Sequence, residues 1–298
     1  MAARVLISGS SGLIGSALLP TLQANGYQVT RLVRRSMGRA DELVWDPAAP
    51  LPPESVSGFK AVIHLAGESI VGRWNDAKKR QILESRVGPT QRLVQALTAA
   101  KQPPRVFVCA SAVGFYGSRG EEVLREDSSS GNGFVAEVCR QWEAAPAPAA
   151  QAGIRVVQTR FGVVLSAKGG ALAKMLPPFR MGVGGKVGDG RQWMPWVDDS
   201  DVAGAILFAI SNESLQGPVN VTAPNPVRNS EFTKTLASVL SRPAIFPMPA
   251  FAARLAFGEM ADELLLSSQH VVPAKLKAAG YSFKNPDLMQ SLKGLLGK

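Results

Sequence analysis

Short apolar runs rich in β-branched residues alternate with longer stretches of helical pattern over the first 160 residues. The runs lie at 4–8, 27–33, 60–66, 105–110 and 154–159. The firmest helical patterns cover 13–25, 75–100 and 134–151, and Pro146 and Pro148 are expected to end the last one early. Parallel strands need crossover helices of this kind. The alternation therefore predicts an α/β fold with a doubly wound parallel sheet.

The pattern changes after residue 160. A stretch rich in glycine and proline covers 168–190, and 196–222 has the pattern of a helix followed by a strand. Short helices punctuated by proline continue from there to Lys298. We expect a nucleotide-binding domain at 1–165, to which 196–222 return, and a smaller lobe made of 166–195 and 223–298. The substrate is expected in the cleft between them.

Composition, the length of apolar runs and the number of cysteines indicate a globular chain and argue against a membrane-spanning or disulfide-rich protein. With 46% hydrophobic and 19% charged residues, the chain has the composition of a globular protein. It has no signal-peptide pattern and no apolar run near the ~18 residues of a spanning helix, so we expect a cytoplasmic protein with no membrane partner. Two cysteines are too few for a disulfide framework or a metal cage, and no metal is expected.

The net charge of +10 favours anionic partners. No motif of a nucleic-acid-binding fold accompanies this charge, and acidic residues alternate with basic ones across 76–92 and 275–287. The charge therefore favours a small phosphorylated ligand, and no nucleic acid is expected.

Three glycines form a G-x-x-G-x-x-G pattern between the first apolar run and the first helix. Gly9 is placed to make the turn, Gly12 to let a pyrophosphate approach the backbone, and Gly15 to let the helix pack on the strand. A helix N-terminus at this point favours an anion. The loop is therefore predicted to bind a dinucleotide through Gly9, Ser10, Ser11, Gly12, Leu13, Ile14 and Gly15.

The charge that follows the second apolar run selects the cofactor. An NAD site normally places Asp or Glu there to hold the ribose 2′-hydroxyl, but no acidic residue precedes Asp41. The run ends instead in Arg34 and Arg35, and a guanidinium matches the geometry of a phosphate. The sequence therefore predicts NADP(H). The alternative is that these arginines form only a solvated basic edge.

These residues, together with HLAG at 64–67, ASAVGFYG at 110–117 and GDGRQWMPWVDDSDV at 188–202, resemble the extended branch of the short-chain dehydrogenase/reductase superfamily. The closest resemblance is to its epimerase-like, poorly characterised subfamily, some members of which carry a cell-division-inhibitor label. The resemblance implies a Rossmann core with a small C-terminal α+β substrate lobe. It also implies NADP(H) contacts at Val33, Arg34, Leu65, Ala66, Gln81, Arg86 and Val164. Three residues near predicted strand ends are added to the cofactor site: Gly67, Ala110 and Arg160.

The chain departs from the superfamily at the catalytic pair. Hydride chemistry there relies on Tyr-x-x-x-Lys, in which the lysine lowers the pKa of the tyrosine so that the phenol can exchange a proton. None of the three tyrosines in this chain has a lysine four residues later. The best register puts Phe134 and Val138 at the two positions. The usual pair is therefore absent.

Three residues remain as catalytic candidates. The resemblance implies that Ser111 hydrogen-bonds the substrate, although the segment is one residue longer than the common Ser-x-x-x-Tyr-Gly spacing. Tyr116 and Glu137 are in range to exchange a proton with the substrate. The alternative is that Tyr116 is a packing aromatic and Glu137 a surface charge of its helix.

The predicted substrate segment also departs from nucleotide-sugar epimerases. These carry Arg at the last position of Gly-x-Gly-x-Gln-x-Arg, where this chain has Met194. The difference disfavours a nucleotide sugar and favours a more apolar pocket. Arg191, Trp193 and Trp196 are the predicted substrate contacts.

Two functions remain open from the sequence. The first is an NADP(H)-dependent oxidoreductase or epimerase-like enzyme, monomeric or homodimeric, that acts on a small carbonyl or hydroxyl compound. The second is an NADP(H)-binding regulatory or scaffold protein without turnover, which the loss of the catalytic pair favours.

Overall fold

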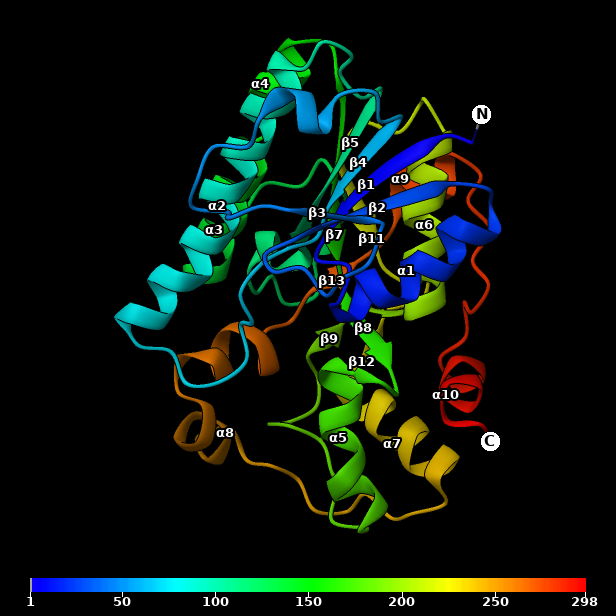
Figure 1. Cartoon of the computed structure of the whole chain (residues 1–298). Coiled ribbons are helices and arrows are strands. Elements are labelled where there is room, and N and C mark those ends of the chain that lie inside the picture. The colour runs from blue at the N-terminus through cyan, green and yellow to red at the C-terminus, as the bar shows by residue number, and fades with distance from the viewer. Residues whose placement is uncertain (1) are drawn as a thin grey trace.

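The computed structural model describes residues 2–298. A seven-stranded sheet, in the order β11-β7-β5-β4-β1-β2-β3, lies at its centre (Figure 1). Every neighbouring pair in this sheet is parallel, as predicted. Its strands are β1 Arg4–Ser8, β2 Gln28–Val33, β3 Glu42–Val44, β4 Ala61–His64, β5 Val106–Ala112, β7 Arg155–Phe161 and β11 Gly217–Val221.

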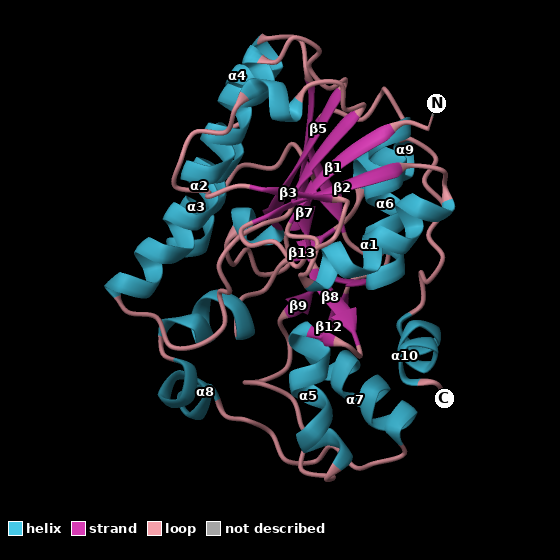
Figure 2. Cartoon of the chain, in the orientation of Figure 1, coloured by secondary structure: helices cyan, strands magenta, loops and turns pink. Residues whose placement is uncertain are grey.

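Helices cover both faces of the sheet (Figure 2). Helices α1 Leu13–Ala24 and α6 Asp199–Ser211 pack together on one face, and α2 Asp76–Ala99 and α3 Phe134–Ala144 lie on the other. As predicted, the helical stretch after residue 134 is broken, and α4 Ala147–Gln151 begins directly after Pro146. Helix α9 Ala274–Ala278 packs against β11 at the edge of the sheet, although its residues belong to the predicted lobe.

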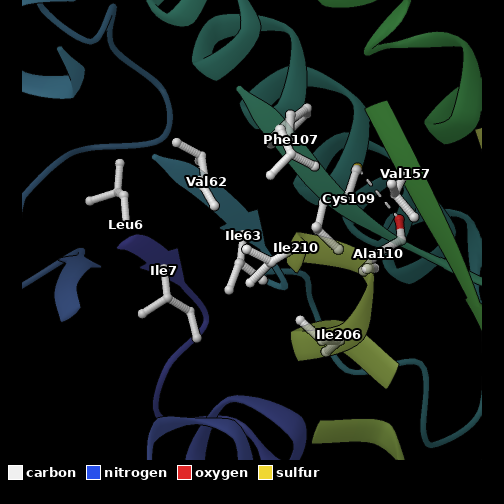
Figure 3. Close-up of a cluster of buried hydrophobic side chains, with 14 of the residues drawn as sticks. Leu6, Ile7, Val62, Ile63, Phe107, Cys109, Ala110, Val157, Ile206 and Ile210 are labelled. Carbon is white, nitrogen blue, oxygen red and sulfur yellow. Dashed lines mark hydrogen bonds between the residues drawn. The ribbon is translucent and has the colours of Figure 1, made fainter. Parts of the chain in front are cut away.

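The main core lies between the sheet and these helices. Leu6 and Ile7, neighbours in β1, are both fully buried, because each face of the sheet is covered. Figure 3 shows Ile206 and Ile210 of α6 among the buried side chains of the central strands. Strands buried on both faces take apolar residues at successive positions. This burial explains why the runs in the sequence show no alternation of polar and apolar residues.

A second, smaller core lies beyond the carboxyl edge of the sheet. Its centre includes Trp196, Phe232 and Leu172, all fully or almost fully buried. Two short strand pairs, β8–β10 and β9–β12, contribute to this core, whereas the pair β6–β13 forms a third cluster with Val113 and Tyr116. The elements outside the central sheet and its covering helices are β6 Val123–Leu124, β8 Val163–Ser166, α5 Gly170–Arg180, β9 Trp193–Met194, β10 Trp196–Asp198, β12 Val227–Arg228, α7 Asn229–Leu240, α8 Ala250–Phe257, β13 His270–Val271 and α10 Leu288–Leu296. Single turns of other helix types occur at Pro53–Val56, Val113–Tyr116 and Ala261–Leu265.

The strand order creates a crevice. Strands β1 and β4 are neighbours, but the helices that follow them, α1 and α2, lie on opposite faces of the sheet. In open parallel sheets, ligands bind at such a switch point, outside the carboxyl ends of the strands. Among residues 2–298, no helix combines the length and the apolar character that a membrane span requires.

Candidate functional site

A cavity of about 1010 Å³ lies at the carboxyl ends of β1, β2 and β4. Its walls come from the glycine loop after β1, the arginine-rich segment after β2, the turn after β4 and the start of the segment after β3. Predicted cofactor residues in its lining are Gly9, Ser10, Ser11, Gly12, Val33, Arg34, Arg35, Leu65, Ala66 and Gly67. The switch-point crevice therefore brings together most of the predicted loop and the predicted arginines.

The glycine loop has the geometry that its spacing requires. Gly9 has φ +72°, and a Cβ there would lie 2.7 Å from the carbonyl carbon of Leu65. A Cβ on Gly15 would lie 2.2 Å from the Gly9 oxygen, so α1 could not pack this closely with any other residue. Leu13 and Ile14 begin α1, whose first turn holds no acidic side chain. The positive end of the helix dipole is therefore free to attract an anion.

The end of β2 is lined by cations. Arg34 and Arg35 are exposed, and within the described chain neither guanidinium takes part in an ion pair. Arg31, inside β2, pairs with Asp41 through Nη2 and Oδ2 at 3.4 Å. The Nε and Nη1 atoms of Arg31 are buried with no hydrogen-bond partner in the described structure. This wall therefore offers several unpaired N–H donors to an anion.

Two carboxylates line the cavity, and both are engaged elsewhere. Glu42 Oε2 accepts hydrogen bonds from the Met37 amide at 2.7 Å and the Ser36 hydroxyl at 2.9 Å. Glu68 accepts from Lys78 Nζ at 2.6 Å, and this hydrogen bond and charge lower the pKa of Glu68. Neither carboxylate is therefore free to select a ribose hydroxyl.

Arg86 holds the turn after β4 in place. Its Nη2 donates to the Glu68 carbonyl at 2.9 Å, and its guanidinium carbon lies 3.3 Å from the point where a Cβ on Gly67 would stand. The guanidinium also lies over the Trp142 ring, 5.1 Å from its centroid. Arg86 is absent from the residues that line the cavity. It therefore supports the turn that carries Leu65 and Ala66.

The remaining predicted cofactor residues lie outside this cavity. Gln81 lines an adjacent cavity of about 910 Å³ along α2. Val164 is half-buried in β8, and Ala110 is buried within β5.

His64, at the end of β4, is fully buried beside the cavity. Its Nδ1 forms a 2.6 Å hydrogen bond with the Ser8 hydroxyl, and its Nε2 is buried with no partner in the described structure. Burial lowers the pKa of His64 to about 4, because the charged form would lose its hydration. The imidazole is therefore neutral at neutral pH.

This burial makes stability depend on pH. The pKa of His64 is lower in the folded state than in the unfolded chain. The free energy of unfolding is therefore highest above about pH 6.5 and falls as the pH drops towards 4, because the unfolded chain takes up a proton first. We expect acidification across this window to cost the wild type roughly 3 kcal/mol more than a His64→Gln variant. Urea unfolding of both proteins at a series of pH values measures the difference. Parallel pH profiles would contradict the assignment.

Ser111 and Arg160 lie side by side in β5 and β7, in a buried network centred on Glu143. Glu143 Oε1 accepts from Ser111 Oγ at 2.6 Å and from Arg160 Nε at 2.8 Å, and its Oε2 accepts from Arg160 Nη2 at 2.7 Å. The Tyr116 hydroxyl accepts from Arg160 Nη1 at 2.8 Å and donates to Asn220 Oδ1 at 2.7 Å. The network joins the predicted site residues Ser111, Tyr116 and Arg160, and none of these three lines the cavity.

In this structure these three residues are engaged with one another and with Glu143, and the roles predicted for them remain predictions. Ser111 is 2% exposed and Arg160 3% exposed, so neither reaches a ligand in this structure. Tyr116 is fully buried, and its burial raises the pKa of its phenol to about 12. A phenol with this pKa and no access to solvent is a poor proton donor or acceptor at neutral pH.

The other catalytic candidate and the predicted substrate contacts are also engaged. Glu137 is exposed on α3 and pairs with Arg140 and Gln141, so the structure does not bring it to the cavity. Trp196 is fully buried in the second core and donates to the Asn225 carbonyl at 3.0 Å, so it packs inside the protein in this structure.

Trp193 and Arg191 lie near the surface of the smaller region. The Trp193 ring stacks on His270 with 4.0 Å between centroids, and its Nε1 donates to Glu121 at 2.9 Å. The side chain of Arg191 is exposed. These two contacts therefore remain predictions.

Both cysteines, Cys109 and Cys139, are buried free thiols. Burial raises the pKa of each thiol, that of Cys139 to about 12. Neither is therefore a reactive thiolate at neutral pH. Within residues 2–298, no group of three or more metal-ligating side chains is placed to hold a metal ion.

Comparison with known proteins agrees with the class that this fold and loop define, a dinucleotide-binding α/β protein. A family model described as the NAD dependent epimerase/dehydratase family matches residues 5–222, and a domain of unknown function, DUF1731, matches residues 248–295. The chain therefore belongs to the NAD dependent epimerase/dehydratase family.

The relatives cover nearly the whole chain. Epimerase family protein Mb2239 of Mycobacterium bovis is 43% identical over 290 residues, which are 97% of this chain and 96% of that protein. The crystal structure of human epimerase family protein SDR39U1 (isoform 2) with NADPH is 36% identical, covers 99% of both chains and has a TM-score of 0.92. UDP-glucose 4-epimerase of Thermus thermophilus in complex with NAD covers 99% of both chains at 21% identity and a TM-score of 0.76, which shows a shared fold.

Proposed function

We propose that this protein binds NADP(H) in the cavity at the carboxyl ends of β1, β2 and β4. The observation that carries the proposal is the wall of unpaired cationic N–H groups at the end of β2, where the nearby carboxylates are already engaged. The glycine loop and the N-terminus of α1 would hold the pyrophosphate, and Arg34 and Arg35 the 2′-phosphate. The NADPH bound to the human relative supports the same cofactor.

The buried nitrogens of Arg31 add a second argument for a phosphate. An unpartnered buried guanidinium N–H group costs free energy, which an anionic ligand would recover by accepting from it. An NAD-type carboxylate at this wall would instead repel such a phosphate. The cavity therefore matches NADP(H) better than NAD(H).

With NADPH bound, the cofactor supplies a hydride, and we infer that the protein is an oxidoreductase or epimerase-like enzyme for a small carbonyl or hydroxyl compound. The second candidate function, binding without turnover, is favoured by a specific observation. The phenol of Tyr116 is buried, and the Ser111 hydroxyl is bound to Glu143. Neither is available as the proton donor that hydride transfer to a carbonyl requires.

Slow or undetectable turnover is expected with ordinary sugar and alcohol substrates, even when NADPH is bound. A screen of carbonyl compounds that follows NADPH oxidation measures this rate. Turnover above about 1 per second, the low end for typical enzymes, would show that another group replaces the missing pair and would exclude the non-catalytic alternative.

Two variants test the remaining proton-transfer candidates if turnover is found. Tyr116→Phe and Glu137→Gln are each expected to change the rate less than tenfold, because one side chain is buried and the other is paired on the surface. A larger loss in either variant, with cofactor affinity unchanged, would restore that residue as a catalytic candidate.

A further inference from the structure

Most of the exposed large apolar side chains among residues 2–298 lie in two segments, 181–183 and 245–255. The two segments lie side by side, because the Phe246 amide donates to the Gly184 carbonyl at 3.3 Å and the Met248 amide to the Lys186 carbonyl at 2.8 Å. Figure 1 shows the chain between α7 and α8 passing the end of α5 at this edge of the molecule. We call this surface the apolar patch: Met181, Val183, Ile245, Phe246, Phe251 and Leu255.

Helix α8 directly follows the 245–248 segment in the chain and also turns apolar side chains to solvent. Phe251 and Leu255 are one turn apart and are 72% and 74% exposed, whereas Ala253 is fully buried on the other side of the helix. A surface helix normally turns its polar side chains outward. A contiguous apolar surface that remains in water marks an interaction site.

The charge around the patch is mostly basic, although Arg254 of α8 pairs with the exposed Asp262. No Asp or Glu occurs in 167–188 or in 232–258, although these segments hold seven Lys and Arg residues. Arg180, Lys186 and Arg242 are exposed, and Arg242 Nε donates to the Arg180 carbonyl at 3.1 Å, which places these two residues together. A basic rim around apolar side chains is complementary to an anionic partner with an apolar interior.

We propose that the apolar patch is a peripheral membrane contact that docks on a bilayer containing anionic phospholipid. Phe246, Phe251 and Leu255 enter the region between headgroups and acyl chains, while Arg180 and Arg242 contact the phosphates. Because two copies joined at this patch would oppose their basic rims, a second copy of the chain fits less well.

This inference departs from the expectation of no membrane partner. That expectation rested on the lack of a spanning segment, and a peripheral contact requires none. The inference does not depend on the proposed cofactor, since the patch and the cavity share no residue.

Cosedimentation of the full chain with vesicles tests the proposal. The probes are vesicles of phosphatidylcholine alone and vesicles that also contain phosphatidylglycerol. The wild type is expected to bind only the anionic vesicles, and raising the salt from about 0.1 M to about 1 M should weaken binding, because rim charges are screened. The double variants Phe251→Ser/Leu255→Ser and Arg180→Glu/Arg242→Glu should each reduce binding about tenfold or more.

Matched controls change the same kinds of side chain elsewhere. Val44→Ser and Lys101→Glu alter exposed residues far from the patch in the sequence and should bind as the wild type does. If the Phe251→Ser/Leu255→Ser variant fails to fold, the Arg180→Glu/Arg242→Glu variant still tests the proposal. Both arginine side chains are exposed, so this variant is expected to fold.

Three results would overturn the proposal. The first is no binding of the wild type to anionic vesicles, and the second is binding that neither double variant weakens. The third is a concentration-dependent dimer, seen by light scattering, that the Phe251→Ser/Leu255→Ser variant abolishes. This last result would assign the patch to a second copy of the chain.

Discussion

Replacing Glu143 with alanine is expected to lower the free energy of unfolding by about 3–5 kcal/mol, the usual cost of breaking a buried ion pair from one side. The Arg160 guanidinium is 3% exposed and would lose the carboxylate that accepts from its Nε and Nη2. The Ser111 hydroxyl would lose its acceptor as well. Urea unfolding of the two proteins at neutral pH measures the change.

Glu137 provides a matched control on the same helix. It also pairs with an arginine, Arg140, but both side chains are substantially exposed. Glu137→Ala is therefore expected to lower the free energy of unfolding far less than Glu143→Ala does. Equal costs at the two positions would contradict the picture of a buried network that fixes α3 to β5 and β7.

Changing Arg34 to aspartate is expected to weaken NADPH binding by about 10- to 100-fold, the equivalent of roughly 1.5–3 kcal/mol for a charge-assisted hydrogen bond. The physical cause is loss of the contact between the guanidinium and the 2′-phosphate. The affinity for NADH, which lacks this phosphate, should change little. Fluorescence titration of the bound nicotinamide measures both affinities.

Arg105→Asp serves as the control for this charge reversal. Arg105 is exposed just before β5, at the amino edge of the sheet, where no cofactor contact is expected. Arg105→Asp alters the net charge by the same amount as Arg34→Asp does. If Arg105→Asp weakens NADPH as strongly as Arg34→Asp does, the effect is one of overall charge and the assigned contact is wrong.

The fold was predictable because its signals are local. Each predicted apolar run overlaps a strand of the central sheet, and the prolines after residue 145 do interrupt the helix. Strand β3 was not predicted, because it is three residues long and lies at the exposed edge of the sheet, where no apolar run is needed. Helix α2 contains Pro89 without ending there, since packing of a long helix outweighs one lost backbone hydrogen bond.

The lining of the cavity at the carboxyl ends of β1, β2 and β4 was predictable for the same reason. The glycine loop and the arginines are contiguous in the sequence, and their geometry follows from the turn between β1 and α1. The catalytic candidates depend on distant contacts instead. Glu143 lies 32 residues after Ser111, and Asn220 lies 104 residues after Tyr116, so no local pattern reveals that these groups are paired and buried.

The buried nitrogens of Arg31 also escaped prediction. In the sequence, Arg31 differs little from its neighbours Arg34 and Arg35. Only the strand pairing with β3 shows that it is enclosed beside the cavity and held by Asp41.

Calorimetric titration of the wild-type protein with NADPH and with NADH tests the central claim most directly. The two ligands differ only in the 2′-phosphate, so their difference in affinity reports the proposed contact at the end of β2. We expect NADPH to bind about 10- to 100-fold more tightly than NADH, with the preference falling as salt is raised. Equal affinities, or tighter binding of NADH, would contradict the proposed cofactor.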